Sequence, residues 1–457
     1  THSLTHSLTH SLTHSLTVEE QLLLDFYSAM VGTNWNSQCT DTRRMAGCWL
    51  SEDSYCEWLG VGCAENGSVV SLILRNNNLQ GELPDFIANF TSLVTLDLSN
   101  NVYTGEISTA WAPLTQLRSL DVSNTLLTRF DGIANLTNLR NLSLPVLLYP
   151  DIIGGVANLK NLEALDLNFV GMERTIPEPI RNLTSLRKLR LTGSKIVDFR
   201  GLANLVQLEY LDMARFASRK LTLQYTDTLT RLTKLQYLAL TRTHITPEIL
   251  SHILTLRNLR TLRLAHGNLT ALPPNFFASF PALTSLDLRK TNLQGEIPSR
   301  VSDSPMLSQL LLQDNYFHGK IPEAICQLQH LTVLNLTNNQ LNGSIPSCLG
   351  NITALKVLAL GINSLIAEIP ESFGDLVNLE VLDLRLNRLS GNISENLGRL
   401  EKLTELNLAS NALTGPLPFE VGALFKENLV TLDASNNFLA GELPLLIMFN
   451  PNSHLVC

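Results

Sequence analysis

Apolar and polar positions along the chain follow one pattern that is repeated about sixteen times. From Val69 onward the pattern is L-x-x-L-x-L-x-x-N-x-L-x-G-x-I-P, with a spacing near 24 residues. In the copy that begins at Leu331, residues 333–337 alternate between apolar and polar side chains, which predicts a short strand. An Ile-Pro step, as at Ile345-Pro346, ends the strand tendency and starts a return segment. The pattern therefore predicts one strand and one return segment in every copy.

The spacing of the copies identifies the type of repeat. The first apolar position falls at Val69, Leu93, Leu117, Leu139, Leu162, Leu186, Leu208, Leu235, Leu259, Leu283, Leu307, Leu331, Leu355, Leu379, Leu403 and Leu429. A period of 20 to 29 residues with this leucine and asparagine pattern is typical of a leucine-rich-repeat solenoid. One coil cannot bury its own apolar edge, so neighbouring coils stack into a continuous core. We predict an α/β solenoid, a right-handed arc of about 16 repeats with parallel strands on the concave side and 3₁₀ or irregular coils behind.

The ninth position of the repeat is asparagine at both ends of the array. It holds Asn77 and Asn101, and it is asparagine again in every repeat from Asn315 to Asn437. We expect this side chain to bond main-chain groups that are left unpaired where the strand ends. In between, the position holds Thr125, Leu147, Val170, Ser194, Phe216, Thr243, Gly267 and Thr291. Threonine and serine can partly replace the asparagine, whereas leucine, valine and phenylalanine cannot, so we expect a changed local curvature in the middle repeats.

The G-x-I-P segment resembles the hallmark of plant-specific leucine-rich repeats. It is present as Gly295-Glu-Ile-Pro298, Gly319-Lys-Ile-Pro322 and Gly343-Ser-Ile-Pro346, and with leucine as Gly81-Glu-Leu-Pro84, Gly415-Pro-Leu-Pro418 and Gly441-Glu-Leu-Pro444. This resemblance extends over most of the chain. It implies an extracellular recognition module similar to the ectodomains of plant-type receptor kinases and receptor-like proteins.

Four of the seven cysteines precede the first repeat, where the open end of the core needs a cover. Cys39, Cys48, Cys56 and Cys63 allow three pairings. The run from Cys56 to Cys63 resembles the C-x-W-x-G-V-x-C of the N-terminal cap in plant-type extracellular repeat proteins. That resemblance implies a disulfide between Cys56 and Cys63, and it leaves Cys39 and Cys48 as the second pair.

The other three cysteines lie in or after the repeats. Cys326 and Cys348 fall on the back of adjacent coils, two positions out of register. We expect them to be buried free thiols, with a bridge between them as the alternative. Cys457 ends the chain, and we expect its partner to lie beyond the residues of this sequence.

The domain organisation follows from these segments. Residues 1–17 contain THSL four times and are expected to be disordered or artefactual; residues 18–68 form the N-terminal cap, with a helix in 22–30. Residues 69–444 form the repeats, and 445–457 begin an incomplete C-terminal cap. No signal peptide or transmembrane segment is visible in the sequence. We expect that the chain is part of a longer one and that it meets a membrane only through a segment outside it.

Charge and glycosylation motifs narrow the location. The net charge of −8 and the pI near 5.7 argue against nucleic acid as a partner. Ten N-x-S/T motifs are candidate glycosylation sites: Asn66, Asn89, Asn135, Asn141, Asn182, Asn268, Asn335, Asn342, Asn351 and Asn392. Together with a disulfide cap, they favour an extracellular or cell-surface protein made in the secretory pathway.

A candidate ligand site lies in the irregular middle repeats. The exposed strand positions of repeats 6 to 10 carry Arg187, Lys188, Arg190, Arg215, Arg242, Arg260, Arg263, His266, Arg289 and Lys290, with Phe169, Tyr210 and Tyr237 beside them. Only Glu209, Asp212 and Asp287 oppose these cations. Such a positive patch attracts anions, and arginine with aromatic faces suits carboxylate, sulfate or sugar-acid groups. The alternative is an ordinary solvated face with the ligand bound elsewhere.

Nothing in the sequence indicates catalysis, a metal or a cofactor. An aspartate follows the second leucine in many repeats (Asp97, Asp121, Asp166, Asp212, Asp287, Asp383 and Asp433), as expected from the L-D-L-S wording of the repeat. No nucleophile is paired with a base, so we predict that the chain is not an enzyme. His244, His252 and His266 could approach one another on adjacent coils, but no carboxylate pattern supports a metal site. The four histidines of the THSL segment are interpreted as accidental.

The predicted function is recognition. We expect an extracellular peptide, glycan or protein to bind on the concave face, with a co-receptor as a possible partner at the C-terminal repeats. The alternative is a soluble secreted inhibitor or cell-wall adhesion protein that resembles the polygalacturonase-inhibitor group. Binding that survives high salt would favour a peptide or protein over a polyanion.

Overall fold

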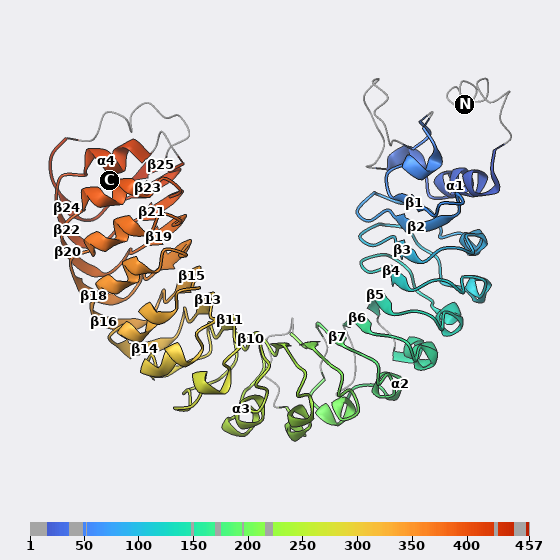
Figure 1. The fold of residues 1–457 in the computed structure, drawn as a ribbon, viewed down its shortest axis with the longest axis horizontal. Coiled ribbons are helices and arrows are strands. Elements are labelled where there is room, and N and C mark those ends of the chain that lie inside the picture. Colours follow the sequence, from blue (N-terminus) through green and yellow to red (C-terminus); the bar gives the residue numbers. More distant parts are fainter. Residues whose placement is uncertain are drawn as a thin grey trace. The chain divides into compact units, whose positions relative to one another are not determined.

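The computed structural model describes residues 16–35, 49–51, 53–147, 150–169, 175–193, 196–214, 223–424, 428–442 and 454–456. The contacts divide the chain into two compact units. Unit 1 comprises residues 1–196 and 200–208, and unit 2 comprises residues 197–199 and 209–457. Both units consist of stacked coils, each with one strand on one side and a short helix or turn on the other (Figure 1).

Unit 1 begins with the helix α1 (Val18–Ala29). Thr17 caps it, because its hydroxyl accepts a hydrogen bond from the Glu20 amide at 3.1 Å, and Thr-x-x-Glu is the sequence of a capping box. The helix buries Leu23 and Phe26 completely. The helix expected in residues 22–30 is confirmed, but it begins four residues earlier, at Val18, because Thr17 caps it there.

Tryptophans pack around this helix and close the end of the first coil. The Trp35 indole donates to the Met30 carbonyl at 2.8 Å, and the Trp49 indole donates to the Leu59 carbonyl at 2.8 Å. The Trp35 and Trp49 ring centroids lie 4.8 Å apart, edge to face. Buried indoles with satisfied N–H groups make a stable apolar cover for the core.

The strands of unit 1 form a sheet on one face of the coils. They are β1 (Val61–Cys63), β2 (Val69–Ile73), β3 (Thr95–Asp97), β4 (Ser119–Asp121), β5 (Asn141–Leu147), β6 (Ala164–Phe169) and β7 (Lys188–Arg190). β1 pairs with β2 in antiparallel orientation. Each later strand pairs in parallel with the next, one repeat further along the chain.

The main sheet of unit 2 is parallel throughout. Its strands are β8 (Tyr210–Asp212), β9 (Tyr237–Ala239), β10 (Thr261–Arg263), β11 (Ser285–Asp287), β13 (Gln309–Leu311), β15 (Val333–Asn335), β17 (Val357–Ala359), β19 (Val381–Asp383), β21 (Glu405–Asn407), β23 (Thr431–Asp433) and β25 (His454–Val456). The pairing sets leucine opposite leucine, as with Leu286 and Leu310. We call the solvent-exposed side of each main sheet, which points away from the leucine core, the strand face.

Unit 2 also has a second sheet that the sequence did not predict. Its strands are β12 (Gln294–Glu296), β14 (Tyr316–Gly319), β16 (Gln340–Ser344), β18 (Ser364–Ala367), β20 (Arg388–Asn392), β22 (Ala412–Gly415) and β24 (Phe438–Leu439). They pair in parallel along the segment between the repeat asparagine and the Ile-Pro step. Gly319 and Gly343 hold positive φ angles of 77° and 75° there, a conformation that glycine adopts without strain.

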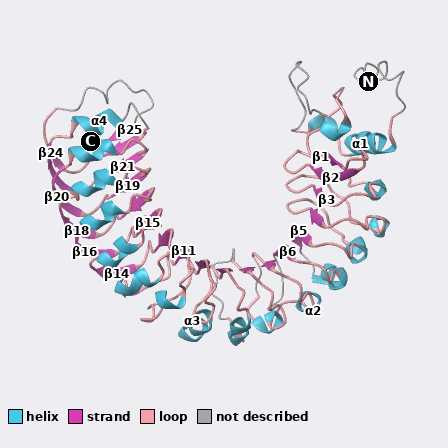
Figure 2. Cartoon of the chain, in the orientation of Figure 1, coloured by secondary structure: helices cyan, strands magenta, loops and turns pink. Residues whose placement is uncertain are grey.

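Helices follow the Ile-Pro step of most coils. The remaining α-helices are α2 (Glu178–Arg181), α3 (Pro247–Ile253) and α4 (Phe419–Ala423). The 3₁₀ helices are η1 (Gly32–Asn34), η2 (Tyr55–Glu57), η3 (Asp85–Asn89), η4 (Thr109–Trp111), η5 (Asp131–Asn135), η6 (Pro150–Asn158), η7 (Phe199–Leu202), η8 (Thr226–Arg231), η9 (Phe277–Ser279), η10 (Ser299–Asp303), η11 (Glu323–Gln327), η12 (Ser347–Asn351), η13 (Glu371–Asp375) and η14 (Glu395–Arg399). Within each unit they lie on the side of the coils away from the main sheet (Figure 2).

The core and the asparagine ladder agree with the repeat pattern. Leu331, Leu334, Leu336 and Leu341 are all fully buried. The Asn339 amide donates to the carbonyls of Leu312 at 3.1 Å and Leu336 at 3.0 Å, and its oxygen accepts from the Phe317 amide at 3.0 Å. The predicted role of the asparagine is therefore confirmed.

Threonine replaces part of this bonding in the middle repeats, as expected. Thr125 donates to the Val122 carbonyl at 2.7 Å, and Thr291 donates to the Leu288 carbonyl at 2.6 Å. Thr243 bonds the Leu240 carbonyl in the same way. Val170, Ser194 and Phe216 lie outside the described residues, and the changed curvature stays a prediction.

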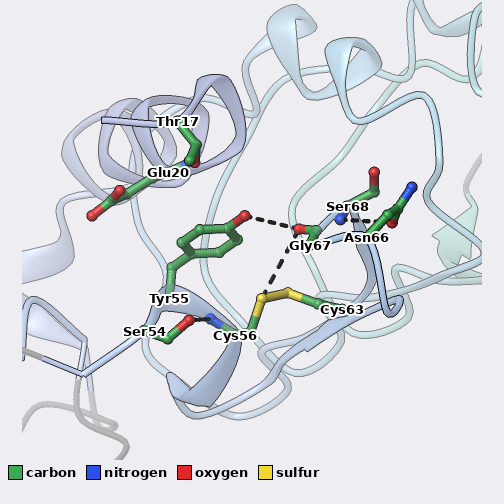
Figure 3. The surroundings of a disulfide bond; sticks show 9 residues. All are labelled: Thr17, Glu20, Ser54, Tyr55, Cys56, Cys63, Asn66, Gly67 and Ser68. Atoms are coloured by element: carbon green, nitrogen blue, oxygen red, sulfur yellow. Dashed lines mark hydrogen bonds between the residues drawn. A yellow bond between two sulfur atoms is a disulfide. The ribbon is translucent and has the colours of Figure 1, made fainter. Parts of the chain in front are cut away.

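The cap disulfide between Cys56 and Cys63 is present, as the resemblance implied. It joins η2 to β1, and the Tyr55 hydroxyl beside it donates to the Gly67 carbonyl at 2.8 Å (Figure 3). The THSL segment up to residue 15, Cys39, Cys48 and Cys457 lie outside the described residues. No helix among the described residues has both the length and the apolar character needed to cross a bilayer.

The expectation of free thiols at Cys326 and Cys348 is wrong, because a disulfide joins them. Cys326 lies in η11 and Cys348 in η12, and their Cα atoms are 5.7 Å apart, within the usual range for a disulfide. An offset of two residues displaces a side chain by only about 4 Å along a 3₁₀ helix. The register difference in the sequence was therefore too small to separate the two sulfur atoms.

Candidate functional site

A stacked pair of tyrosines lies at the start of the strand face of unit 2. Tyr210 in β8 and Tyr237 in β9 are opposite each other in the parallel register. Their ring centroids are 4.0 Å apart and the ring planes differ by 10°. The two tyrosines therefore occupy equivalent positions of successive repeats, and the pair forms a rigid aromatic platform with polar tips.

Arg263 in β10 extends this platform toward the next strands. Its Nη1 donates to the Tyr237 hydroxyl at 3.5 Å, and its Nε lies 3.7 Å from Asp287 Oδ2. The hydrogen bond to Tyr237 is the main influence that raises the pKa of Arg263. The guanidinium is therefore charged and held beside the tyrosines, with 44% of its side chain exposed.

Asp287 in β11 positions a second arginine. Arg289 Nη2 lies 2.9 Å from Asp287 Oδ2, and only 2% of the Asp287 side chain is exposed. One buried carboxylate thus faces two guanidinium groups, which leaves a net positive charge. Charge-assisted contacts of this kind fix the orientation of the arginines before any ligand arrives.

Three cations form a row where the strands end. Arg242, His266 and Lys290 occupy the eighth position of successive repeats, all with φ angles near the left-handed region, at 63°, 58° and 53°. Their amides donate to the next coil, at Ala265, Arg289 and Gln313 carbonyls 2.8, 2.9 and 3.1 Å away. Neighbouring strands lie about 4.8 Å apart, so the row concentrates positive charge on one edge of the strand face.

The pKa of His266 reports this concentration of charge. It is lowered from 6.5, first by burial and then by repulsion from Arg242, Lys290 and Arg289, while Asp287 acts weakly in the opposite direction. The cations are therefore close enough to act on one another. We call Tyr210, Tyr237, Arg242, Arg263, His266, Arg289 and Lys290 the Tyr-Arg cluster.

The remaining predicted site residues are Arg260, Arg215 and four residues of unit 1. Arg260 immediately precedes β10 and is exposed. Arg215 lies outside the described residues. Phe169, Arg187, Lys188 and Arg190 belong to unit 1, where Arg190 Nη1 lies 2.6 Å from Asp166 Oδ2. Burial raises the pKa of Asp166 more than Arg190 and Lys188 lower it.

Two acidic neighbours temper the charge of the cluster. Asp314 Oδ2 lies 3.9 Å from Lys290 Nζ, and Asp314 was not among the acidic residues expected to oppose the cations. The Tyr210 hydroxyl donates to Asp212 Oδ2 at 3.4 Å. Asp314 occupies the same repeat position as Lys290, one coil further on, so the repeat register alone would have found it.

An apolar cavity of about 400 Å³ lies beside α3 in the same unit. Leu250 and Leu254 line one side, and Leu269, Leu272 and Pro273 line the other. In this coil α3 begins soon after Ile245. Later coils have the Gly-x-Ile-Pro segment at this place in the repeat, and the cavity arises because this coil lacks that segment. Among the described residues, no group of three metal-binding side chains lies together, and His252 Nδ1 lies 3.0 Å from the Thr226 hydroxyl.

Comparison with known proteins gives the family. The sequence family model for the leucine-rich repeat region matches residues 71–213 and 275–417, which together are more than half of the chain. The chain belongs to the leucine-rich-repeat family. No curated protein matches the sequence.

Solved structures similar to this leucine-rich-repeat chain include plant receptor ectodomains. The plant peptide hormone receptor RGFR1, in complex with RGF2, is 28% identical with a TM-score of 0.64, over 87% of this chain and 67% of that one. A TDR receptor is 27% identical with a TM-score of 0.63, over 84% and 63%. Arabidopsis HAESA, with the peptide hormone IDA and the co-receptor SERK1, shares the fold at 24% identity and a TM-score of 0.65, over 96% and 81%. The chain thus spans about two thirds of the RGFR1 and TDR chains.

Proposed function

We propose that the chain is an extracellular, receptor-like recognition module that binds the anionic group of a peptide or protein ligand at the Tyr-Arg cluster. The observation that carries the proposal is the row of Arg242, His266 and Lys290 where the strands end, beside Arg263 and Arg289, which Asp287 holds in place. On a chain of net charge −8, this positive region is local. It attracts anions and not general polyanion surfaces.

The chemistry of the cluster suits a carboxylate or sulfate. Arg263 and Arg289 are prearranged by Asp287, so little side-chain freedom is lost on binding. The tyrosine pair adds a flat aromatic surface with hydroxyl groups at its edge. An anion with an adjoining extended segment fits this combination better than a large neutral molecule.

A peptide or protein is the ligand class that the similar structures favour. RGFR1, at 28% identity, is a plant peptide hormone receptor whose structure was solved in complex with RGF2. For this chain, a co-receptor and a location at the cell surface remain proposals. The disulfides and the ten glycosylation motifs support passage through the secretory pathway.

The domain boundaries belong to the same proposal. We take residues 18–68 as a cap, residues 69–444 as the recognition array and residues 445–457 as the start of a second cap. The ligand then binds within the array, away from both caps. Arg187, Lys188 and Arg190 of unit 1 are candidate ligand-binding residues in the same proposal.

The test uses a random dodecapeptide library displayed on phage and panned on the secreted, glycosylated chain. One enriched peptide is synthesised, and its Kd is measured with the wild type and with the double variant Arg263→Glu and Lys290→Glu. Reversal of both charges should raise the Kd at least about tenfold, as is usual for the loss of charged contacts at an interface.

The matched control is Arg399→Glu with Lys402→Glu. Arg399 ends η14, Lys402 follows it, and both side chains are exposed. The control variant therefore has the same net charge as the cluster variant, while its strand face is unchanged. The control should bind the peptide like the wild type. Equal binding by the cluster variant would show that the Tyr-Arg cluster is not the ligand site.

A further inference from the structure

The strand face of unit 2 becomes more apolar two coils beyond the Tyr-Arg cluster. Val333 in β15, Val357 in β17 and Val381 in β19 lie side by side in the parallel register, each partly exposed. At the same repeat position, β9, β10, β11, β13 and β21 carry Tyr237, Thr261, Ser285, Gln309 and Glu405. Three adjacent valines therefore replace polar or aromatic side chains.

The strand face of the β17 coil is apolar except at its edge, where Lys356 Nζ lies 2.7 Å from Glu380 Oε1 of the next coil. Its other outward positions are Val357, Ala359, Gly361 and Ile362. Ala359 is 6% exposed, and Gly361 is buried against Asp383, because a Cβ on it would lie 2.7 Å from Asp383 Oδ1. The centre of this coil is thus a low, apolar surface.

Ile362 and Leu386 continue the apolar surface at the end of the strands. Both have left-handed backbones, with φ angles of 55° and 52°, which is unfavourable for branched and bulky residues. In the other described coils with this turn the residue is glycine or polar: Gly193, Asn76, Asn100, Asn124, Arg242, His266, Lys290, Asp314, Asn338, Ser410 and Asn436. The turn is imposed by amide bonds to Arg385 and Ala409 carbonyls at 2.7 and 2.8 Å.

Leu386 is 50% exposed, and an asparagine would adopt the same backbone with less strain. Strained residues that the surrounding structure holds in place gather at functional sites, and adjacent exposed apolar side chains are typical of contact surfaces. We call Val333, Val357, Val381, Ile362 and Leu386 the apolar strip.

We propose that the apolar strip binds apolar side chains of the same extended peptide whose anionic group occupies the Tyr-Arg cluster. This inference rests on the proposed function. β10 and β17 are separated by four parallel pairings, or about 19 Å at 4.8 Å per strand. An extended peptide spans that distance with about six residues. The ligand class is therefore a linear peptide with an acidic group and an apolar side chain about six residues apart.

A peptide fits the strip better than a broad partner surface. The strip is narrow, and charged or amide side chains border it: Asp383 and Arg385 on β19 and its end, and Asn335 on β15. Asn335 is also a glycosylation motif directly opposite Ala359 in the register. A glycan on Asn335 is thus the competing occupant of the strip.

The experiment uses the same phage-displayed dodecapeptide library on the secreted full chain. Peptides enriched on the wild type should carry aspartate or glutamate about six residues from leucine, isoleucine, valine or phenylalanine. For a synthetic peptide of this kind, Ile362→Asn with Leu386→Asn should raise the Kd about tenfold. The melting temperature should not fall, because asparagine tolerates the left-handed turn.

The matched control is Val377→Asn with Val430→Asn, which replaces two exposed apolar residues outside the strip. It should bind the peptide like the wild type. If charge reversal in the Tyr-Arg cluster weakens the peptide but Ile362→Asn with Leu386→Asn does not, the inference is overturned and the proposed function stands. If neither variant weakens it, both are overturned.

The variant Asn335→Gln separates the glycan from the peptide. If the wild type selects no acidic-apolar peptides but Asn335→Gln does, the chain's own glycan occupies the strip and the inference is overturned. Equal selection by both proteins, together with the loss on Ile362→Asn and Leu386→Asn, supports the peptide as occupant.

Discussion

At the scale of single residues, Asn363 shows how one side chain joins two coils. Its amide donates to the carbonyls of Leu336 and Leu360, both at 3.0 Å, and its oxygen accepts from the Leu341 amide at 3.0 Å. These main-chain groups are removed from water, so they lose their partners when the side chain is shortened. The ladder therefore contributes to stability through satisfied backbone groups and not through apolar contact.

We predict that Asn363→Ala lowers the free energy of unfolding by about 2 to 3 kcal/mol, because buried donors and acceptors are left unpaired. Urea denaturation followed by circular dichroism measures the change. Gln340→Ala, at an exposed position of β16, should leave the midpoint nearly unchanged. A similar loss in both variants would contradict the role of the ladder.

His266 provides a second prediction at this scale. Burial and the neighbouring cations lower its pKa from 6.5, so the unfolded chain binds the proton at a higher pH than the folded chain. The lowered pKa therefore costs stability below about pH 6.5 and has no effect well above it. An NMR titration of the imidazole should give a pKa below 6.5 in the wild type.

The charge dependence of this titration tests the cluster. Lys290→Ala should raise the pKa of His266, since a repelling cation is removed, whereas Lys402→Ala should not change it. Sulfate bound to the cluster should also raise the pKa, and a bound anion should therefore be held more tightly as the pH falls through that pKa. A wild-type pKa at or above 6.5 would refute the electrostatic description of the site.

At the scale of elements, the strands were predictable and the second sheet was not. Alternation in residues 333–337 predicts β15 (Val333–Asn335) because inward leucines alternate with outward residues. β16 (Gln340–Ser344) has one buried leucine between exposed neighbours and a glycine at positive φ. Its strand character comes from pairing with the neighbouring coils, which no single repeat encodes.

The disulfide between Cys326 and Cys348 was likewise not predictable, because it depends on how adjacent coils are offset in space. Cys326 and Cys348 are 22 residues apart in sequence, and closing a loop of that length stabilises a fold by about 3 kcal/mol. We predict that Cys326→Ser with Cys348→Ser lowers the urea midpoint accordingly. Peptide mapping without reduction should show the two cysteines linked in the wild type; two free thiols there would contradict the bond.

At the scale of the whole molecule, the repeat pattern determined the fold class, the core and the chain order of the coils. The candidate site was only partly predictable. Repeat register placed Tyr210 beside Tyr237 and aligned Arg242, His266 and Lys290, because equivalent positions stack. The pairing of Asp287 with both Arg263 and Arg289 depends on side-chain directions, and the strained turn at Ile362 depends on backbone angles, neither of which the sequence pattern specifies.

The two halves of the proposed ligand surface should respond differently to salt. Attraction between exposed charges is screened over about 10 Å at 0.1 M salt and about 3 Å at 1 M, whereas apolar contact is not weakened by sodium chloride. We predict that the Kd of the acidic-apolar peptide rises as sodium chloride increases from 0.05 to 0.5 M, without loss of all binding.

The salt dependence of the Kd should be smaller for Arg263→Glu with Lys290→Glu and unchanged for Ile362→Asn with Leu386→Asn. Isothermal calorimetry at four salt concentrations measures both slopes. A Kd that is independent of salt in the wild type would remove the anionic contact from the recognition of this peptide and leave the apolar strip as its main contact.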